Sequence, residues 1–138
     1  MTINYDKIYE CAASARKNAY APYSEFAVGA AVLLRDGRVI TGANVENASY
    51  PLSLCAERAA LTAAYSAGAR KPDIVAIGII GATTEPISPC GACRQVIAEL
   101  MAPEAEVVLF NLEKEKKIFK VSDLLPYPFS SEAMRDGR

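Results

Sequence analysis

Hydrophobic and polar positions follow two different periods along the chain. Over residues 5–19, apolar or small residues recur at helical spacing with charged residues between them, which predicts an amphipathic helix. Residues 26–34 form a nearly continuous apolar run, and residues 38–45 form a shorter extended segment. The Asp36-Gly37 pair between these two segments is typical of a tight turn. The first third of the chain therefore predicts a helix followed by a β-hairpin.

The remainder of the chain alternates helical and extended segments. Helices are predicted to begin at Ser53 and at Ser88-Pro89, because serine is a good N-cap and proline suits the first helical position. The first of these is expected to run to about Ala67, with Gly68 just past its end. The segments predicted as strands are 73–82, 106–112 and 117–121, and about the last eight residues are expected to fray.

The order of these elements is helix, hairpin, helix, strand, helix, strand, strand. This alternation predicts a layered α/β domain with one mixed sheet, in which the strand–helix–strand crossovers are right-handed. The helices that begin near residues 53 and 88 would lie side by side on one face of the sheet, with their N-termini at the same end. No linker, repeat or low-complexity tract divides the chain, so residues 1–138 are expected to form a single domain.

Composition and charge exclude several classes of function. Hydrophobic residues make up 51% of the chain and charged residues 22%, which is ordinary for a globular protein. The net charge of −1 provides no general attraction to nucleic acid. No apolar run reaches the roughly 18 residues of a membrane span, and the first residues lack the apolar core of a signal peptide. A cytoplasmic protein without a membrane or nucleic-acid partner is therefore expected.

Four cysteines and the absence of histidine define the candidate chemistry. Cys55, Cys90 and Cys93 fall in the two predicted helix starts, whereas Cys11 lies on the apolar stripe of the first helix and is expected to be a small buried hydrophobe. Zinc binds thiolates tetrahedrally, and a catalytic zinc keeps its fourth position open for water. Three cysteines fit that pattern. Glu57, two residues after Cys55, is placed where a general acid/base would be needed.

The charge of three thiolates raises a difficulty for this hypothesis. Helix N-termini carry partial positive charge and stabilise thiolates, but three of them on a divalent ion weaken its ability to acidify water. We expect Arg58, on the same helix face as Cys55, to donate a hydrogen bond to ligand sulfur and offset that charge. Gln95 and Arg94, which follow Cys93, are weaker candidates for the same role.

Two alternatives remain open from the residues alone. A Cys-x-x-Cys pair can be half of a structural zinc site or a redox pair. A structural site needs a fourth protein ligand, which only Cys11 could supply. The chain could then be a non-catalytic, zinc-stabilised binding module.

The motifs also resemble a known family. Cys-Ala-Glu-Arg at 55–58, followed by Pro-Cys-Gly-Ala-Cys-Arg-Gln at 89–95, is similar to the zinc nucleoside deaminases, and specifically to the small, homotetrameric cytidine deaminases. Residues 20–24 with Phe26 resemble the family's N-terminal segment. Residues 42–50 resemble its ribose-binding stretch, and 124–126 with Phe129 its C-terminal motif. The resemblance therefore covers essentially the whole chain.

This resemblance implies a fold and a reaction. The fold would be a three-layer α/β/α sandwich with a mixed five-stranded sheet, and the assembly a homotetramer with active sites shared between subunits. The enzyme would hydrolyse cytidine and deoxycytidine to uridine and deoxyuridine plus ammonia, in pyrimidine salvage. One zinc ion per subunit, held by Cys55, Cys90 and Cys93, would activate the water that attacks C4, with Glu57 as proton shuttle.

The same resemblance implies the substrate contacts. Asn44 and Glu46 would hydrogen-bond the ribose hydroxyls, with loop capping as the alternative role of this pair. Phe26 would pack against the nucleoside, and Ala56 would use its backbone N–H on the base. Phe129 would stack on the pyrimidine from a neighbouring subunit. A related aminohydrolase such as a blasticidin S deaminase, which takes a bulkier nucleoside, is the nearest alternative.

Overall fold

The computed structural model describes residues 2–137. Its helices and strands, in chain order, are α1 (Tyr5–Arg16), β1 (Val28–Leu34), β2 (Val39–Ala43), α2 (Ala56–Ser66), β3 (Ile74–Gly81), α3 (Gly91–Leu100), β4 (Glu106–Phe110), β5 (Lys116–Lys120), α4 (Val121–Leu124) and α5 (Ser131–Asp136). Two short 3₁₀ turns, Tyr50–Leu52 and Lys71–Asp73, precede α2 and β3. The five predicted strands are all present, with slightly different bounds.

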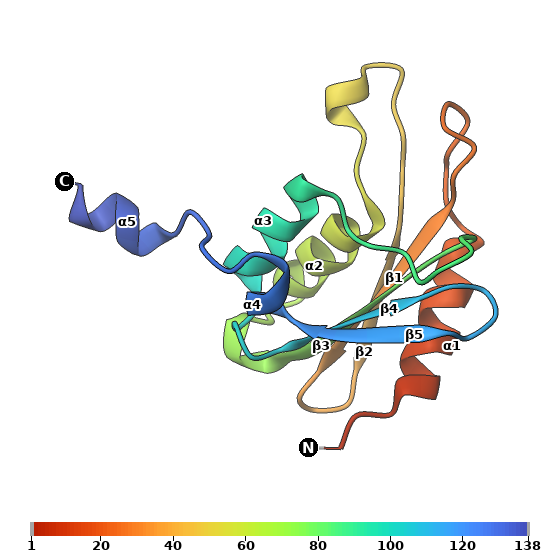
Figure 1. Ribbon diagram of the computed structural model, residues 1–138. Helices are drawn as coiled ribbons and strands as arrows, with labels where there is room; N and C mark the ends of the chain where they lie inside the picture. The colour runs from red at the N-terminus through yellow and green to blue at the C-terminus, as the bar shows by residue number, and fades with distance from the viewer. Residues whose placement is uncertain (1, 138) are drawn as a thin grey trace.

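The strands form one mixed sheet in the order β2-β1-β3-β4-β5. Helix α1 covers one face of this sheet, and α2 and α3 lie side by side on the other (Figure 1). The three-layer α/β/α sandwich expected from the sequence is therefore confirmed. Within residues 2–137, none of the helices has the length and apolarity that crossing a membrane would require.

The topology brings the N-termini of α2 and α3 to the same end of the sheet. Strand β1 pairs antiparallel with both β2 and β3, so β2 and β3 run in the same direction, and β4 pairs parallel with β3. Helix α2 follows β2 and helix α3 follows β3. Because each helix starts from the carboxyl end of its strand, both start at one edge of the sheet.

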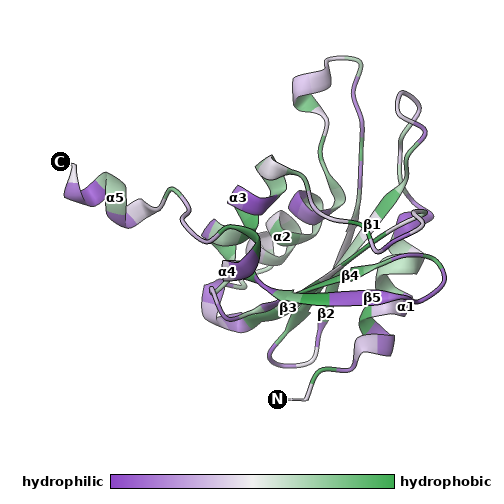
Figure 2. Ribbon diagram, in the orientation of Figure 1, coloured by the Kyte–Doolittle hydropathy of each residue, from purple (hydrophilic) through white to green (hydrophobic). Residues whose placement is uncertain are grey.

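Both faces of the central strands are buried. In β1, Ala30, Val32 and Leu34 pack toward α2 and α3, whereas Ala31 and Leu33 pack toward α1. This two-sided burial explains why β1 reads as an unbroken apolar run rather than an alternating one. Figure 2 shows the same hydrophobic character along the inner strands, whereas β5 at the sheet edge has both hydrophilic and hydrophobic stretches.

Helix α2 approaches β2 closely because Gly42 has no side chain. A Cβ atom at this position would lie 2.5 Å from the backbone nitrogen of Ala60 and 2.9 Å from the backbone oxygen of Ala56. Any larger residue would push the start of α2 away from the sheet. Gly42 therefore helps to set the position of the residues at the N-terminus of α2.

Both cysteine-bearing helices begin later than predicted. Cys55 and Cys90 are themselves the N-cap residues of α2 and α3. Ser53 and Ser88 do not cap these helices, because their hydroxyls accept hydrogen bonds from a loop N–H and from an arginine side chain. The two sulfurs consequently lie at the very ends of the helices rather than within their first turns.

The C-terminal segment also differs from the prediction. Residues 131–136, expected to fray, form α5, which Ser130 caps by accepting a hydrogen bond from the backbone N–H of Ala133 at 3.3 Å. All residues of α5 are exposed, and the helix projects away from the three layers (Figure 1). Residues 131–136 are thus helical where the sequence offered no regular structure, and residue 138 lies outside the described residues.

Candidate active site

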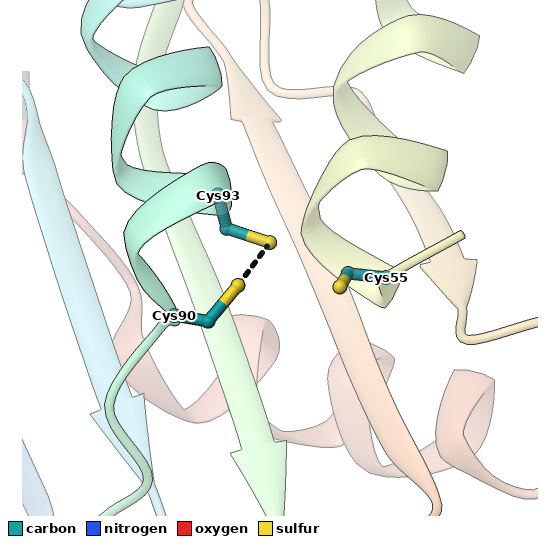
Figure 3. Close-up of side chains that lie close together, drawn as sticks. All are labelled: Cys55, Cys90 and Cys93. Carbon is teal, nitrogen blue, oxygen red and sulfur yellow. Dashed lines mark hydrogen bonds between the residues drawn. The ribbon is translucent and has the colours of Figure 1, made fainter. Parts of the chain in front are cut away.

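Three cysteine sulfurs meet between the N-termini of α2 and α3. The Sγ atoms of Cys55, Cys90 and Cys93 all lie within 4.8 Å of one another, and those of Cys90 and Cys93 are 3.5 Å apart. Figure 3 shows the side chains of both helices pointing into the space between them. Cys93 is buried, Cys55 half-buried and Cys90 exposed. The predicted ligand set is therefore brought together.

The geometry of these sulfurs fits a zinc ion. Zinc–sulfur bonds of about 2.3 Å in a tetrahedral arrangement place neighbouring sulfurs roughly 3.8 Å apart. The observed separations, 3.5 Å for one pair and at most 4.8 Å for the others, lie close to that value. Three protein donors leave one tetrahedral position for water, as in catalytic zinc sites.

Cys11 does not take part in this cluster. It packs against the hydrophobic cluster on the α1 side of the sheet, whereas the three sulfurs lie on the side of α2 and α3. The prediction that Cys11 is a packing residue fits this placement, although it is half-buried rather than fully buried. A fourth thiolate from this residue is out of reach of the site.

The electrostatics of the site favour a thiolate at Cys55. Hydrogen bonding with Cys93 and with the Arg58 guanidinium lowers the pKa of the Cys55 thiol to about 5. Hydrogen bonding to Cys55, together with burial, raises the pKa of the Cys93 thiol. The arginine thus stabilises the thiolate form of Cys55.

Arg58 contacts ligand sulfur as predicted. Its Nη2 donates to Cys55 Sγ at 3.6 Å and to the carbonyl oxygen of Ser53 at 3.2 Å. Its Nε is the one buried side-chain nitrogen or oxygen within residues 2–137 that has no hydrogen-bond partner. A buried donor without an acceptor costs about 1–3 kcal/mol. Such a donor beside the cluster suits a site whose sulfurs carry negative charge.

Gln95 and Arg94 do not contact the sulfurs. Gln95 Nε2 donates to the carbonyl oxygen of Phe129 at 2.9 Å, and the Arg94 guanidinium donates to three other oxygen atoms. Gln95 follows Cys93 by two positions, about 200° around the helix, and therefore faces away from the sulfurs. The predicted role of Gln95 beside the metal is not supported by these contacts.

A pocket of about 260 Å³ opens beside the sulfurs. Residues from four segments line it: Ser24, Phe26, Val28, Asn44, Cys55, Ala56, Glu57, Ile87, Ser88 and Cys90. A larger hollow, of about 420 Å³, lies at the opposite end of the sheet between the β1–β2 turn and the end of α2, and no cysteine lines it. The smaller pocket is therefore the candidate site, because it combines apolar walls with the metal-ligating residues.

Glu57 lies in the first turn of α2 and lines this pocket. Its side chain is buried, with only 5% of the residue exposed. Burial raises the pKa of the Glu57 carboxyl above its ordinary value. A carboxyl that can hold a proton nearer to neutral pH is suited to both accepting and donating one.

Phe26, Asn44 and Ala56, which are expected to contact substrate, all line the pocket. Asn44 also fixes the loop end, because its Oδ1 accepts from the Val28 N–H at 2.9 Å and its Nδ2 donates to the Phe26 carbonyl at 2.8 Å. One lone pair and one N–H of the Asn44 amide remain for a ligand. Ala56 is the first residue of α2, where backbone N–H groups lack helical partners.

Glu46 does not line the pocket itself but contacts Ser24, which does. Its carboxylate accepts hydrogen bonds from the N–H groups of Tyr23 and Ser24, each at 3.0 Å, and from the Ser24 hydroxyl. These bonds lower the pKa of Glu46 and hold the loop that carries Ser24 and Phe26 into the pocket. The capping alternative for Glu46 thus describes its contacts within this chain.

Four pocket residues were not predicted from the sequence: Val28, which begins β1, and three residues of connecting segments. Ser24, Ile87 and Ser88 lie in connecting segments, where no hydrophobic period marks which side chains face a pocket. Two of these residues could have been found from their position in the sequence, because Ile87 and Ser88 directly precede Pro89 and the ligand Cys90. Phe129 does not line this pocket and is 65% exposed in the C-terminal segment.

Comparison with known proteins identifies the family. Residues 3–109 match the family model described as the cytidine and deoxycytidylate deaminase zinc-binding region, a span that contains all three cysteines and Glu57. The chain belongs to this deaminase family.

Relatives of this deaminase chain align along most of its length. A cytidine deaminase of Halalkalibacterium halodurans is 54% identical over 125 residues, which cover 91% of this chain and 93% of that protein. A cytidine deaminase of Sporosarcina psychrophila is 43% identical and covers 94% of each chain. The crystal structure of cytidine deaminase from Burkholderia pseudomallei superimposes with a TM-score of 0.89 at 50% identity, covering 92% of this chain and all of that one. The deaminase fold and family expected from the motifs are thus confirmed.

Proposed function

We propose that this chain is a zinc-dependent cytidine deaminase of cytoplasmic pyrimidine salvage, which hydrolyses cytidine and deoxycytidine to uridine and deoxyuridine with release of ammonia. The observation that carries the proposal is the cluster of three cysteine sulfurs beside a pocket that Cys55, Cys90 and the buried Glu57 line. The donor set supports one zinc ion per subunit, held by Cys55, Cys90 and Cys93.

The roles of the chain's own residues in the reaction follow from this geometry. Zinc supplies a Lewis acid that polarises water when bound to the three sulfurs. Glu57 accepts a proton from the attacking water and delivers one to N3 of the pyrimidine as the C4–O bond forms. Glu57 then takes the remaining proton from the C4 hydroxyl and passes it to the amino group as the C4–N4 bond breaks and the C4 carbonyl forms, so that cytidine and water give uridine and ammonia. The raised pKa of Glu57 suits both transfers.

The substrate would be held by residues of the pocket wall. The free donor and acceptor of Asn44 would bind a ribose hydroxyl, and the Ala56 N–H would bind the base. Phe26, 40% exposed, offers a ring against which the nucleoside can pack. Glu46 retains about one free carboxylate lone pair after its bonds to the loop, and we assign that lone pair to a ribose hydroxyl.

We further propose a homotetramer in which neighbouring subunits complete each pocket. Large apolar side chains are exposed on two projecting segments of the chain: Tyr50 and Leu52 before α2, and Tyr127, Phe129 and Met134 near the C-terminus. Exposed apolar groups gathered in this way are typical of interaction surfaces. In such an assembly Phe129 would stack on the pyrimidine of an adjacent subunit.

Replacement of Phe129 by alanine tests the shared pocket. Base stacking on an aromatic ring is worth about 1–3 kcal/mol, so kcat/KM for cytidine should fall roughly 5- to 150-fold. Steady-state kinetics and sedimentation of the same samples would measure activity and assembly together. Ile118→Ala, at an apolar side chain that is 42% exposed on β5 and outside both projecting segments, is the control. An unchanged kcat/KM in an intact tetramer would contradict the assigned stacking.

Replacement of Arg58 by alanine tests the charge balance at the sulfurs. Loss of the hydrogen bond to Cys55 should lower kcat about 10- to 100-fold while zinc and fold are retained. The measurement is kcat at matched zinc content. Arg38→Ala, which removes an exposed arginine of the β1–β2 hairpin, provides the control. If the Arg58→Ala variant turns over cytidine as fast as the parent, the guanidinium does not offset the negative charge of the thiolate ligands in a way that affects catalysis.

The substrate class is tested by a direct comparison of nucleosides. The pocket contacts predict that cytidine and deoxycytidine are deaminated and that blasticidin S, which is bulkier, is a much poorer substrate. Absorbance assays on the three compounds with one enzyme preparation would rank them. A preference for blasticidin S would show that the chain is a related aminohydrolase with a different substrate, such as a blasticidin S deaminase.

A further inference from the structure

The segment that carries Cys90 to the metal site has no regular secondary structure of its own. Residues 82–90 connect β3 to α3, and three of them, Ile87, Ser88 and Cys90, line the pocket. Ser88 and Cys90 are exposed. A Cβ atom on Gly91, the next residue, would meet no atom within 4 Å apart from its chain neighbours and the backbone of its own helix. Cys90 thus enters the helix from an exposed stretch with open space beside Gly91.

A backbone hydrogen bond anchors this segment at Ile87, three residues before Cys90. The backbone N–H of Ile87 donates to the carbonyl oxygen of Phe110, at 3.3 Å, which ties the segment to the end of β4. Pro89 has no N–H to donate, and its ring is buried between two exposed neighbours. Correct placement of Cys90 consequently requires a further tether between Ile87 and the helix.

The Arg94 guanidinium provides that tether. Its Nε donates to the Pro89 carbonyl oxygen at 3.0 Å, and its Nη2 donates to the Ser88 hydroxyl at 2.7 Å. Its Nη1 donates to the carbonyl oxygen of Leu124 at 2.9 Å, at the end of α4. One planar, rigid group thus binds two residues immediately before Cys90 and a third on the C-terminal segment.

The position of Arg94 on α3 explains why it can do this. It follows Cys90, the N-cap of the helix, by four residues, and its backbone N–H donates to the Cys90 carbonyl at 3.0 Å. Side chains in the first turns of a helix lean toward its N-terminus, so Arg94 reaches back over the residues that lead into the helix. Both the backbone and the side chain of Arg94 therefore hold the turn at Cys90.

We propose that Arg94 is a positioning residue that fixes Cys90 for metal binding and joins this ligand to the C-terminal segment. The inference rests on the zinc site of the proposed function. It assigns to Arg94 no contact with substrate or metal. Its effect is exerted through the segment 88–90, and through Leu124 on the stretch that leads to Phe129.

The test measures metal binding rather than turnover. The full-length protein, stripped of metal, is titrated with Co²⁺, whose thiolate charge-transfer absorption reports how the sulfurs are bound, and zinc is then added in competition. Arg94→Ala and Arg94→Lys are compared with the parent. Arg35→Ala is the matched control, because Arg35 also donates from Nε and Nη2 to a backbone carbonyl, that of Pro72, far from the pocket.

We expect Arg94→Ala to weaken Co²⁺ and Zn²⁺ affinity about 10- to 100-fold and to reduce the charge-transfer absorption per bound cobalt. The Arg94→Lys variant should have the circular dichroism spectrum of the parent but recover little of the lost metal affinity. A single ammonium group cannot replace a planar guanidinium that donates to three oxygen atoms. Arg35→Ala should match the parent. Parent-like affinity and spectra in both Arg94 variants would overturn the proposal.

The outcomes also separate this inference from the proposed function. If the parent itself binds Co²⁺ without thiolate absorption, both the proposed zinc site and the proposed role of Arg94 are contradicted. If the parent binds Co²⁺ through thiolates but does not deaminate cytidine, the proposed function is contradicted. The proposed role of Arg94 in metal binding is then still decided by the affinities and spectra of its variants. A lower melting temperature in the Arg94 variants with an unchanged spectrum per bound cobalt would show a merely structural role and contradict the proposal.

Discussion

A Cys93→Ser variant is expected to lose bound zinc and cytidine deamination together. Cys93 is the most buried of the three sulfur ligands, and its Sγ lies 3.5 Å from that of Cys90. A serine hydroxyl is a shorter and poorer zinc ligand that is not ionised near neutral pH. Because the metal supplies several kcal/mol of transition-state stabilisation, activity should fall at least about 10³-fold.

Zinc content by atomic absorption and turnover on the same preparation would check this result. Cys11→Ser is the matched control, because it makes the same substitution at a half-buried cysteine on the other face of the sheet. The control should keep its zinc and its activity. Loss of zinc from Cys11→Ser would instead favour the non-catalytic binding module, and full zinc in Cys93→Ser would remove this residue from the ligand set.

The second large effect is expected from Glu57→Gln. The amide keeps the shape of the buried side chain but cannot accept and return a proton, so the variant should retain zinc while kcat falls by about 10²–10⁴-fold or more. Zinc content and single-turnover kinetics would separate chemistry from metal binding. Glu99→Gln, at an exposed carboxylate on α3, is the control and should behave like the parent.

Near-normal turnover by Glu57→Gln would contradict the proton-shuttle role. Loss of zinc from that variant would be equally informative, because it would mean that the carboxyl supports the metal site. The geometry argues against the latter outcome, since the three sulfurs form the cluster without a carboxylate oxygen.

The layered fold and the ligand set could be predicted because they rest on strong local signals. The apolar runs of β1 and β3 mark strands buried on both faces, and the alternation with helices implies crossovers that place both helix starts at one edge. Three cysteines at those helix starts then had to converge. The sequence order alone therefore implied a metal site at the edge where α2 and α3 begin.

The details that could not be predicted depend on side chains finding partners far along the chain. Ser53 and Ser88 have the residue type of N-caps, yet their hydroxyls accept hydrogen bonds from other segments, and the cysteines occupy the cap positions. Gln95 and Arg94 follow a ligand cysteine, yet their partners are carbonyls of the C-terminal segment and of the 88–90 turn. Spacing along a helix gives the face of a residue but not its distant partner.

The measurement that tests the central claim most directly is the release of uridine and ammonia from cytidine by the purified chain at known zinc content. The enzyme is assayed as prepared, after zinc is removed by a chelator, and after zinc is restored. We predict one ammonia per uridine, loss of turnover without metal, and recovery when one zinc per chain is bound. A chain that holds one zinc on its three cysteines and still leaves cytidine unchanged would contradict the account.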